Sequence, residues 1–325
     1  MEAHKIFSIK TQSEFETEAL SIFRFQIETN PVYREFCRYL NKNTDNVRHF
    51  ADIPFLPIEF FKSKKVIVDN VDHEIMFTSS GTTGNQTSKH YVNDLKLYET
   101  SYLKSFEIFY GAVSEFCILA LLPSYLDRRG SSLIYMMDDL IKKSKNPESG
   151  FYLNDLPGLA DKLRILDAKG NKILLVGVTF ALLDLIEKHD FRLKNTIIME
   201  TGGMKGRRKE LIREELHTLL KKGFGVDAIH SEYGMTELLS QAYSKGNGVF
   251  WTPPWMKIQV RDTEDPLADP ITGKTGGINI TDLANLNSCS FIATQDLGKV
   301  HEDGSFEVLG RFDHSDIRGC NLMAL

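Results

Sequence analysis

Apolar residues within the first 42 positions recur at the spacing of amphipathic helices. One such stretch runs from Phe15 to Ile27, and a second follows Pro31. The pattern therefore predicts two helices within residues 13–42. The next stretch, ADIPFLPIEFFKSKKV, places two prolines among large apolar residues, which favours an extended segment packed against the core.

Helix-like and strand-like stretches alternate from residue 91 to about residue 230. The expected helices cover 91–111, 131–143, 157–168, 180–189 and 207–222, and the expected strands cover 116–122, 172–177, 196–200 and 226–230. Such alternation is typical of a three-layer α/β body, in which helices cover both faces of a largely parallel sheet. Sheets of this kind bind ligands at the carboxyl ends of their strands.

The pattern changes after residue 245. Short β-prone runs such as WMKIQV, GGINIT, CSFIAT, GKVHE and SFEVLG are separated by Gly, Asp and Pro, which predicts a mostly antiparallel β subdomain. The expected organisation is therefore an α/β body over residues 1–245, followed by a smaller β subdomain and C-terminal tail over residues 246–325.

Composition excludes several classes of protein. The chain has 325 residues, 42% of them hydrophobic, without an apolar run long enough to span a membrane, so a globular protein with a full core is expected. The start, MEAHKIFSIK, lacks the apolar centre of a secretion signal, which favours the cytoplasm. A net charge of -5 provides no basic surface for nucleic acid.

The cysteines lie far apart and form no CxxC pair, which argues against a zinc site or a disulfide framework. Cys37, Cys117 and Cys289 fall within helix-like or strand-like patterns, where buried and inert thiols are usual. Cys320 lies five residues before the last residue of the sequence, so we expect its sulfur to be outside any core.

The densest group of small polar residues is FTSSGTTGNQTSKH, residues 77–90. Its hydroxyl side chains surround Gly81 and Gly84, which let the backbone turn its N–H groups toward an anion. Apolar residues before it predict a strand and periodic residues after His90 predict a helix, so we expect a phosphate-binding loop at a strand-to-helix junction. A polar surface loop is the alternative interpretation. The glycines are not followed by Gly-Lys-Ser/Thr, so this is not a Walker loop.

Two more polar clusters follow expected strands. The cluster ETGG, residues 200–203, contains paired glycines that would let a flat ligand approach the backbone, although a plain turn is an equally good interpretation. The cluster SEYGMTE, residues 231–237, combines an aromatic ring, a hydroxyl and a carboxylate that could hold Mg²⁺. A packed Tyr233 and a solvated Glu237 are the alternatives there. Three such clusters at strand ends favour a nucleotide site.

The motifs FTSSGTTG, SEYGMTE and GRFDHSDIRG, in this order, resemble the phosphate-loop, adenine-loop and hinge motifs of the adenylate-forming superfamily of acyl and aryl acid ligases. Within it, the IPFLPIEFFKS segment, the doubled serine and the RGC ending resemble the acyl-protein synthetase (LuxE-like) family, which in luminous bacteria activates fatty acids for reduction to aldehyde. The similarity runs from about residue 12 to the C-terminus. It implies the adenylate-forming N-terminal-domain fold, without the usual C-terminal domain and its lysine.

The resemblance implies a role for each matching residue. Residues that would hold the ATP phosphates are Ser79, Ser80, Gly81, Thr82, Thr83 and Gly84. Gly202 and Gly203 would flank the adenine, and Tyr233, followed by Gly234, would stack on it. Thr236 would contact a phosphate, and Glu237 would bind Mg²⁺.

The resemblance extends to residues beyond these loops. Asp296 would bind the ribose, although Gln295 stands where the family has Gly. Arg311 would make a second ribose or phosphate contact, and Asp313 would mark the hinge. Candidates for the cation that replaces the absent lysine are Lys89, Lys205 and Arg207, and candidate walls of an acid pocket are Phe60, Phe61, Tyr125 and Phe180, unless these aromatic residues simply pack.

The implied activity is the ATP-dependent conversion of a carboxylic acid, expected to be a long-chain fatty acid, into an acyl-adenylate. The acyl group then passes to a protein thiol, expected to be Cys320, with Thr83 and Glu237 as catalytic residues. ATP and Mg²⁺ are the implied cofactors, and an acyl reductase or acyl transferase is the implied partner. The alternatives are an acid:coenzyme A ligase of the phenylacetate type and a noncatalytic nucleotide-binding partner of an acyl-transfer complex.

Overall fold

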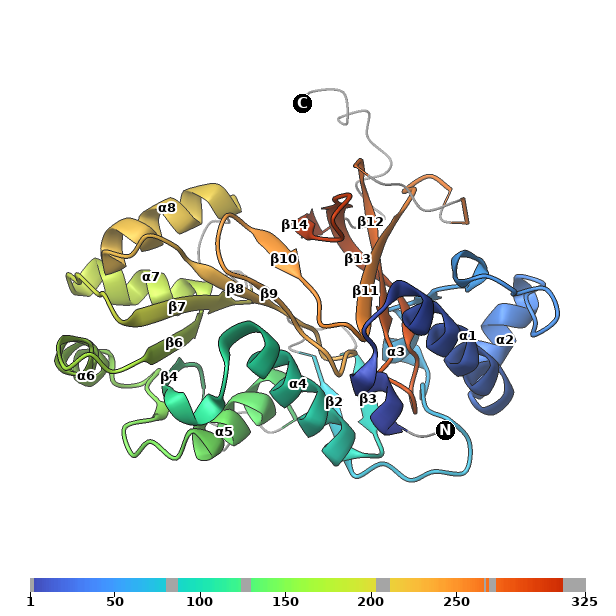
Figure 1. Ribbon diagram of the computed structural model, residues 1–325, viewed down its shortest axis with the longest axis horizontal. Helices are drawn as coiled ribbons and strands as arrows, with labels where there is room; N and C mark the ends of the chain where they lie inside the picture. Colours follow the sequence, from blue (N-terminus) through green and yellow to red (C-terminus); the bar gives the residue numbers. More distant parts are fainter. Residues whose placement is uncertain are drawn as a thin grey trace. The chain divides into compact units, whose positions relative to one another are not determined.

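The computed structural model describes residues 3–79, 87–123, 130–202, 211–265, 267–268 and 273–311 (Figure 1). The chain divides into two compact units. Unit 1 comprises Met1–Val71 and Pro254–Leu325, and unit 2 comprises Asp72–Pro253. The sequence pattern assigned the first 71 residues to the α/β body, whereas the structure groups them with the C-terminal strands.

Unit 2 is built on a mixed sheet with the strand order β10-β9-β8-β7-β6-β4-β5. The strands are β4 Cys117–Leu121, β5 Gly150–Phe151, β6 Ile173–Val178, β7 Thr196–Thr201, β8 His230–Tyr233, β9 Ala242–Ser244 and β10 Val249–Trp251. Strands β4 to β8 run parallel, and β9 and β10 are antiparallel to their neighbours. The residues of β4 and β6 are buried throughout, as expected of parallel strands covered on both faces.

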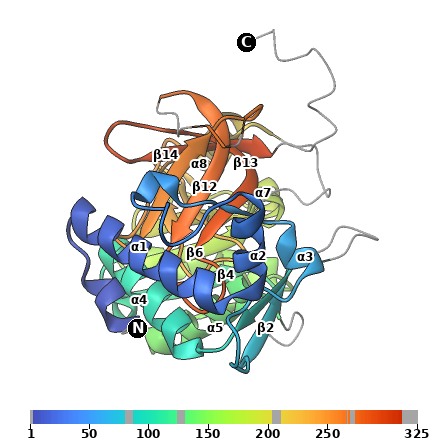
Figure 2. The same ribbon diagram turned by 90° about the vertical axis from the view of Figure 1, so that its right-hand side faces the viewer.

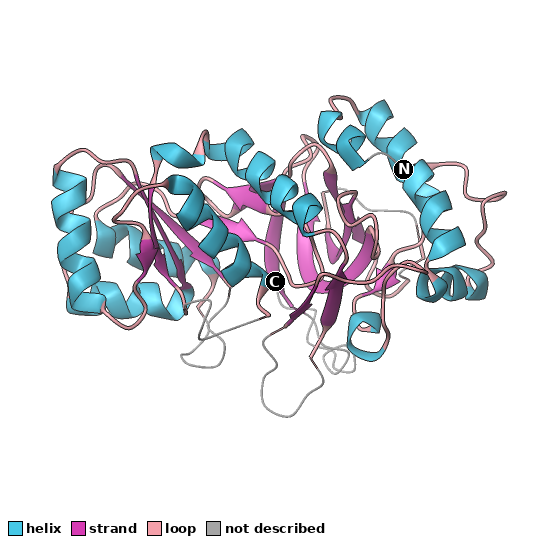
Figure 3. Ribbon diagram, turned by 90° about the horizontal axis from the view of Figure 1, so that it is seen from below, coloured by secondary structure: helices cyan, strands magenta, loops and turns pink. Residues whose placement is uncertain are grey.

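Helices cover both faces of this sheet, with α7 and α8 on one side and α4 and α5 on the other (Figures 1 and 3). The helices of unit 2 are α4 Leu95–Tyr110, α5 Ser132–Ser144, α6 Leu156–Ala168, α7 Thr179–Lys188 and α8 Arg213–Phe224, with a 3-10 turn at Val113–Glu115. Side chains of Asp94, Ser131 and Asp155 cap the first turns of α4, α5 and α6. The expected alternation of strands and helices is therefore confirmed, except that the strand expected at 226–230 lies at His230–Tyr233, so residues 231–233 belong to the strand and do not follow it.

One expected junction is wrong. Strand β2, Ile75–Thr78, and strand β3, Lys89–Val92, pair antiparallel, with Thr78 opposite Lys89. The glycine-rich residues therefore join two antiparallel strands, and they do not lead into a helix. Burial alternates along β3, as is typical of a strand. The last residues of β3 therefore fall at the start of the range 91–111, which was expected to be helical.

Unit 1 contains an antiparallel sheet with the order β11-β12-β13-β14, as expected. Its strands are β11 Met256–Arg261, β12 Thr275–Asp282, β13 Phe291–Val300 and β14 Phe306–Arg311, and β1 Leu56–Pro57 adds parallel to β13. Its helices are α1 Gln12–Thr29, α2 Pro31–Tyr39 and α3 Phe60–Ser63, with 3-10 turns at Ala3–Ser8 and Phe50–Asp52. Helices α1 and α2 pack against each other (Figure 2). The two β-prone runs CSFIAT and GKVHE contribute to one long strand, β13.

The proline-containing segment after α2 is pinned to the core of unit 1, as expected. Leu56 pairs with Ile292 of β13, and the Ile58 amide donates to the Ala293 carbonyl at 3.0 Å. The Tyr33 hydroxyl donates to the Pro54 carbonyl at 2.7 Å. These bonds satisfy polar backbone groups that the two prolines would otherwise leave in an apolar environment.

Gln26 ties α1 to the segment that precedes β13. Its buried amide nitrogen donates to the carbonyls of Asn285 at 3.1 Å and Leu286 at 2.8 Å, and its amide oxygen accepts from the Ser290 backbone at 3.0 Å. In the part of the chain that the structure describes, no helix has the length and apolarity that crossing a membrane requires.

We predict that Gln26→Leu lowers the free energy of unfolding by about 3 kcal/mol, because buried carbonyl and amide groups lose their partner while the volume is kept. Urea denaturation measures this loss. The control is Gln12→Leu, an exposed position on the same helix, which should change stability little. Equal midpoints for the two variants would show that the buried bonds contribute nothing.

Candidate active site

The carboxyl ends of β6, β7 and β8 lie together in unit 2. Thr201, the last residue of β7, is in register with Val178 of β6 and Glu232 of β8. The next residue, Gly202, has a φ of 67°, which strongly favours glycine, and its carbonyl accepts from the Thr179 hydroxyl at 2.7 Å. The turn after β7 is therefore held in place beside the start of α7.

Neighbouring side chains at this edge point to opposite faces of the sheet, because side chains alternate along a strand. Glu200 and Ser231 are in register and contact Arg213 of α8 on one face. Thr201 and Glu232 are the next registered pair, and the Thr201 hydroxyl donates to the Glu232 carboxylate at 2.5 Å. The edge therefore carries one acidic side chain on each face.

Glu200 is a buried carboxylate that lies beside Arg213 and His217. Arg213 Nη1 lies 2.7 Å from Glu200 Oε1 and 3.3 Å from the Ser231 hydroxyl, and His217 Nε2 lies 3.6 Å from the same carboxylate oxygen. Burial raises the pKa of Glu200, but His217 and Arg213 lower it by more, so the net pKa lies below its ordinary value. Glu200 is therefore ionised at neutral pH.

Tyr233, the residue expected to stack on adenine, is half-buried at the end of β8. Its ring lies 6.0 Å from the Phe250 ring at an interplanar angle of 64°. The Arg213 guanidinium lies 5.0 Å from the centre of the same Phe250 ring. Arg213 thus contacts both a strand-end carboxylate and the aromatic residue that packs against Tyr233.

Two elements hold the segment after β8. His90 of β3 is fully buried, and its Nδ1 lies 2.8 Å from the Thr236 carbonyl oxygen. From α4, the Ser101 hydroxyl bonds to the Ser240 hydroxyl at 2.9 Å. Because His90 is the last residue of the motif FTSSGTTGNQTSKH, one flank of that motif contacts the SEYGMTE segment directly.

The other flank is Ser79, one of the expected phosphate-binding residues. The Ser79 hydroxyl accepts from the Ser88 amide at 3.0 Å, and the Ser79 amide donates to the Ser88 carbonyl at 3.2 Å. These bonds extend the β2–β3 pairing by one step. Several of the expected site residues lie outside the described residues, namely Ser80, Gly81, Thr82, Thr83, Gly84, Gly203 and Cys320.

Glu237, the expected metal ligand, is 5% exposed, and Gly234 precedes it in the same turn region. Within the described ranges, no group of three or more His, Cys, Asp or Glu side chains could form a metal site of protein ligands. Mg²⁺ in nucleotide sites takes most of its ligands from phosphates and water, so a single carboxylate is enough. The residues present fit that arrangement.

Asp296 and Arg311, the expected ribose residues, are paired in register across β13 and β14 of unit 1. Arg311 Nε lies 3.6 Å from Asp296 Oδ1, and Arg311 Nη2 donates to the Gln295 side-chain oxygen at 3.1 Å. Gln295 in turn donates to Glu59 at 2.6 Å. Gln295, where the resembling family has Gly, thus bridges two charged residues, and the ribose roles stay predictions.

The other candidates divide between surface, core and undescribed positions. Lys89 is exposed on β3, whereas Phe61 is fully buried in α3 and Phe60 packs edge-on against Phe36. Phe180 lies in the first turn of α7. Tyr125, Lys205, Arg207 and Asp313 lie outside the described residues.

The cysteines at 37, 117 and 289 are all buried, as expected. Burial raises the pKa of the Cys37 thiol to about 12 and also raises the pKa of Cys117 and Cys289 above their ordinary value. A thiol with a raised pKa supplies little thiolate, which is the nucleophilic form. These cysteines are therefore poor acceptors for an acyl group.

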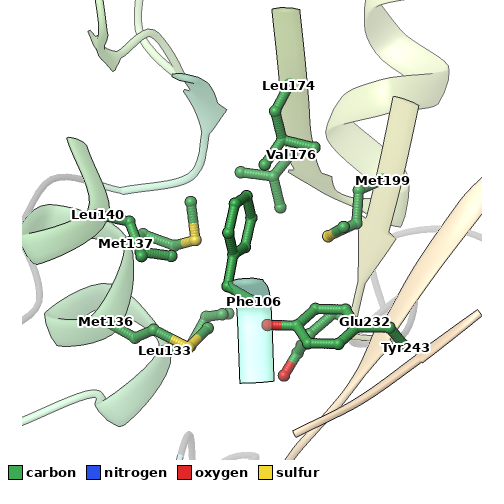
Figure 4. Close-up of a pocket in the computed structure, with 10 residues that line it drawn as sticks. All are labelled: Phe106, Leu133, Met136, Met137, Leu140, Leu174, Val176, Met199, Glu232 and Tyr243. Carbon is green, nitrogen blue, oxygen red and sulfur yellow. The ribbon is translucent and has the colours of Figure 1, made fainter. Parts of the chain in front are cut away.

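A small cavity lies between the sheet of unit 2 and the helices α4 and α5 (Figure 4). Its volume is about 10 Å³, which is no more than one water molecule needs. The residues that line it are Phe106, Leu133, Met136, Met137, Leu140, Leu174, Val176, Met199, Glu232 and Tyr243. Glu232 is the one acidic residue in this lining, and burial raises its pKa from 4.5 to about 7.

Sequence analysis assigned no role to Glu232, Arg213 or His90. Glu232 lies inside a recognised motif, and a strand period extended through Tyr233 would have placed its side chain on the face opposite Ser231. Arg213 and His90 had no such indication, because each reaches the site from another element. The pairing of β2 with β3 places His90 beside Thr236, and the start of α8 places Arg213 beside Glu200.

Comparison with known proteins bears on these motifs. Residues 6–105 match the family model described as "Acyl-protein synthetase, LuxE". Over these residues the chain resembles the LuxE acyl-protein synthetases. A stretch of 66 residues is 36% identical to the long-chain-fatty-acid–luciferin-component ligase of Photorhabdus luminescens, and it covers 20% of this chain and 56% of that protein. The expected family resemblance is confirmed.

Solved structures show the fold of this chain. A 2-hydroxyisobutyryl-CoA ligase in the postadenylation state superposes with a TM-score of 0.66 at 12% identity, over 93% of this chain and 68% of that one. The ATP-bound MatB of Rhodopseudomonas palustris superposes with a TM-score of 0.56 at 18% identity, over 75% of this chain and 49% of that one. The mixed α/β fold of adenylate-forming ligases is therefore confirmed.

We predict that Glu232→Gln changes how stability depends on pH. Because the fold raises the pKa of Glu232 from 4.5 to about 7, the stability that neutral Glu232 provides is complete below pH 4.5 and is lost as the pH rises to about 7. The variant lacks this loss, so across that window its stability relative to the parent should rise by about 3 kcal/mol and then stay constant. Urea midpoints at several pH values measure it, and parallel curves for the two proteins would contradict the assignment.

Proposed function

We propose that this chain is an ATP-dependent acid ligase that activates a fatty acid as an acyl-adenylate and passes the acyl group to a protein thiol. The observation that supports it most directly is the bond between His90 and the Thr236 carbonyl. This bond brings a flank of the FTSSGTTG motif against the SEYGMTE motif, within unit 2. The LuxE family match and the fold shared with adenylate-forming ligases also support an acid ligase.

The first step overcomes the poor reactivity of a carboxylate, which resists attack because it is already an anion. A carboxylate oxygen attacks the α-phosphorus of ATP, an O–P bond forms, and the bond to pyrophosphate breaks. Hydroxyl and backbone N–H groups of residues 79–84 stabilise the phosphate charge. Glu237 would hold Mg²⁺, which would supply further positive charge there.

The adenine would lie against Tyr233, whose ring is held by Phe250. Gly202 has no side chain that would hinder a ligand from approaching its backbone, and Gly203 follows it in the sequence. Thr236 would contact a phosphate. Arg213 acts through its contacts with Glu200 and Phe250, so it positions the strand ends and does not touch the nucleotide.

In the second step a thiolate attacks the acyl carbon, a C–S bond forms, and the bond to AMP breaks. The thiol proton passes to solvent. Cys320 is the proposed acceptor, since the three buried cysteines have raised pKa values that disfavour the thiolate. Coenzyme A is the second candidate acceptor, because a structural neighbour is a ligase crystallised with an acyl-AMP and CoA at a TM-score of 0.63.

We predict that Thr83→Ala lowers acid-dependent ATP–pyrophosphate exchange by about 10²-fold, because one phosphate-stabilising hydroxyl is lost. Glu237→Gln should raise the Mg²⁺ concentration needed for half-maximal exchange. The matched controls are Thr100→Ala and Glu115→Gln at exposed positions of unit 2, where the exchange rate should stay at the parent value. Parent-like exchange in Thr83→Ala and Glu237→Gln would refute the site, and absence of exchange with every acid would favour a noncatalytic nucleotide-binding protein.

We also predict that Cys320→Ser abolishes an acyl adduct without abolishing exchange. Incubation of the parent with ATP, Mg²⁺ and tetradecanoate should add one acyl mass that hydroxylamine removes, as measured by intact-protein mass spectrometry. An adduct that persists in Cys320→Ser would move the acceptor to another residue. Release of acyl-CoA in solution, without any adduct, would favour the coenzyme A ligase.

A further inference from the structure

The cavity in unit 2 is lined mainly by apolar side chains. Helix α5 contributes Leu133, Met136, Met137 and Leu140, and the sheet contributes Leu174, Val176 and Met199. Figure 4 shows these apolar side chains arranged around the Phe106 ring, with Glu232 and Tyr243 at one side. A lining of this composition is suited to a hydrocarbon and offers few groups that could bind a polar ligand.

The cavity begins where the strand ends form the candidate site. Glu232 directly precedes Tyr233, and its partner Thr201 directly precedes Gly202. Val178, at the carboxyl end of β6, is in register with Thr201, and Leu174 precedes Val178 by four residues on the same strand. At about 3.3 Å per residue, this face of the sheet therefore offers about 13 Å of apolar depth.

The cavity is nearly closed, so a chain that enters must displace side chains. Met136 and Met137 of α5 and Met199 of β7 line the cavity, and methionine is unbranched and changes rotamer readily. Opening the cavity by such changes needs no movement of the sheet.

Glu232 has no described cation as a contact. Its hydrogen-bond partner is the Thr201 hydroxyl, and the ionisable groups near it are Tyr110 of α4, Tyr243 of β9 and Glu200 of β7. Glu200 lies on the opposite face with Arg213, and the cavity residues of α5 are all apolar. His230 on β8 bonds to Tyr110 at 3.2 Å, and burial lowers its pKa to about 4, so it is neutral.

From this geometry we infer that the cavity receives the apolar chain of the acid substrate, and that Glu232 selects against chains that carry charge. The inference rests on the proposed function and deepens it. Neutral Glu232 tolerates a methylene chain beside it and needs only the Thr201 bond. Ionised Glu232 needs solvation that a bound chain removes, and it repels a second carboxylate.

The test compares decanoate with decanedioate, which has the same carbon number and a second carboxylate. In ATP–pyrophosphate exchange the parent should show a KM for decanoate that rises about tenfold between about pH 6 and about pH 8, because the neutral fraction of Glu232 falls by that factor. Glu232→Gln should remove this rise and should lower the parent's preference for decanoate over decanedioate. Glu115→Gln, at an exposed carboxylate paired with Lys172, should behave as the parent does.

A second variant tests the cavity separately from the charge. Met137→Ala enlarges the cavity, so it should shift the preferred acid toward chains longer than that of the parent in a series from hexanoate to tetradecanoate. Calorimetric titration with decanoate in the absence of ATP provides a readout that does not need turnover. Binding should be weaker at about pH 8 than at about pH 6 in the parent and equal at both in Glu232→Gln.

The outcomes separate the two proposals. If no acid supports exchange but decanoate binds with the stated dependence on Glu232, the proposed function fails and the apolar site stands. If exchange is active while neither Glu232→Gln nor Met137→Ala changes pH dependence, chain preference or binding, the inference is overturned and the acid chain binds elsewhere.

Discussion

The hydrogen bond between Thr201 and Glu232 joins the ends of two parallel strands at the point where the candidate site begins. Register makes this bond possible, because Thr201 and Glu232 are opposite each other and their side chains share a face. The same register places Glu200 and Ser231 on the other face, where Arg213 neutralises the carboxylate. Two carboxylates on adjacent strands therefore differ in charge at neutral pH, because the neighbours of Glu200 keep it ionised whereas burial raises the pKa of Glu232 to about 7 and leaves about half of it neutral.

The second constraint is the β2–β3 hairpin. Its pairing sets the position of His90, whose ring bonds to the backbone beyond β8. A phosphate loop that led into a helix would gain its anion affinity from the helix N-terminus. In this chain the glycine-rich residues are followed by strand β3 and not by a helix, and the His90–Thr236 contact ties β3 to the segment after β8.

Sequence patterns predicted the elements of unit 2 well, because each strand or helix carries its own periodicity over enough residues. They missed β3, since four residues with alternating burial precede a long helical pattern that dominates the window. The motifs SEYGMTE and ETGG located the strand ends, yet Arg213 and Glu232 had no assigned role. The role of Glu232 depends on the face of the sheet to which its side chain points, and the role of Arg213 depends on the position of α8 beside that sheet. Neither feature can be read from neighbouring residues in the sequence. The grouping of residues 1–71 with the C-terminal strands escaped prediction for the same reason, because Gln26 and Leu56 bond to residues more than 230 positions away.

The departure of Gln295 from the family pattern has a structural cause within unit 1. A glycine at this position would remove the side-chain amide of Gln295. The amide oxygen accepts from Arg311, and the amide nitrogen donates to Glu59. Glu59 belongs to the segment that follows β1, and Arg311 ends β14, so the amide links the proline-rich segment to the strand that carries the GRFD motif. Arg311 is 70% exposed at its side chain, and an exposed ion pair with Asp296 contributes little by itself. The Gln295 bridge thus adds a second contact to Arg311 beside the ion pair, and through Glu59 the segment after β1 becomes part of the support for the end of β14.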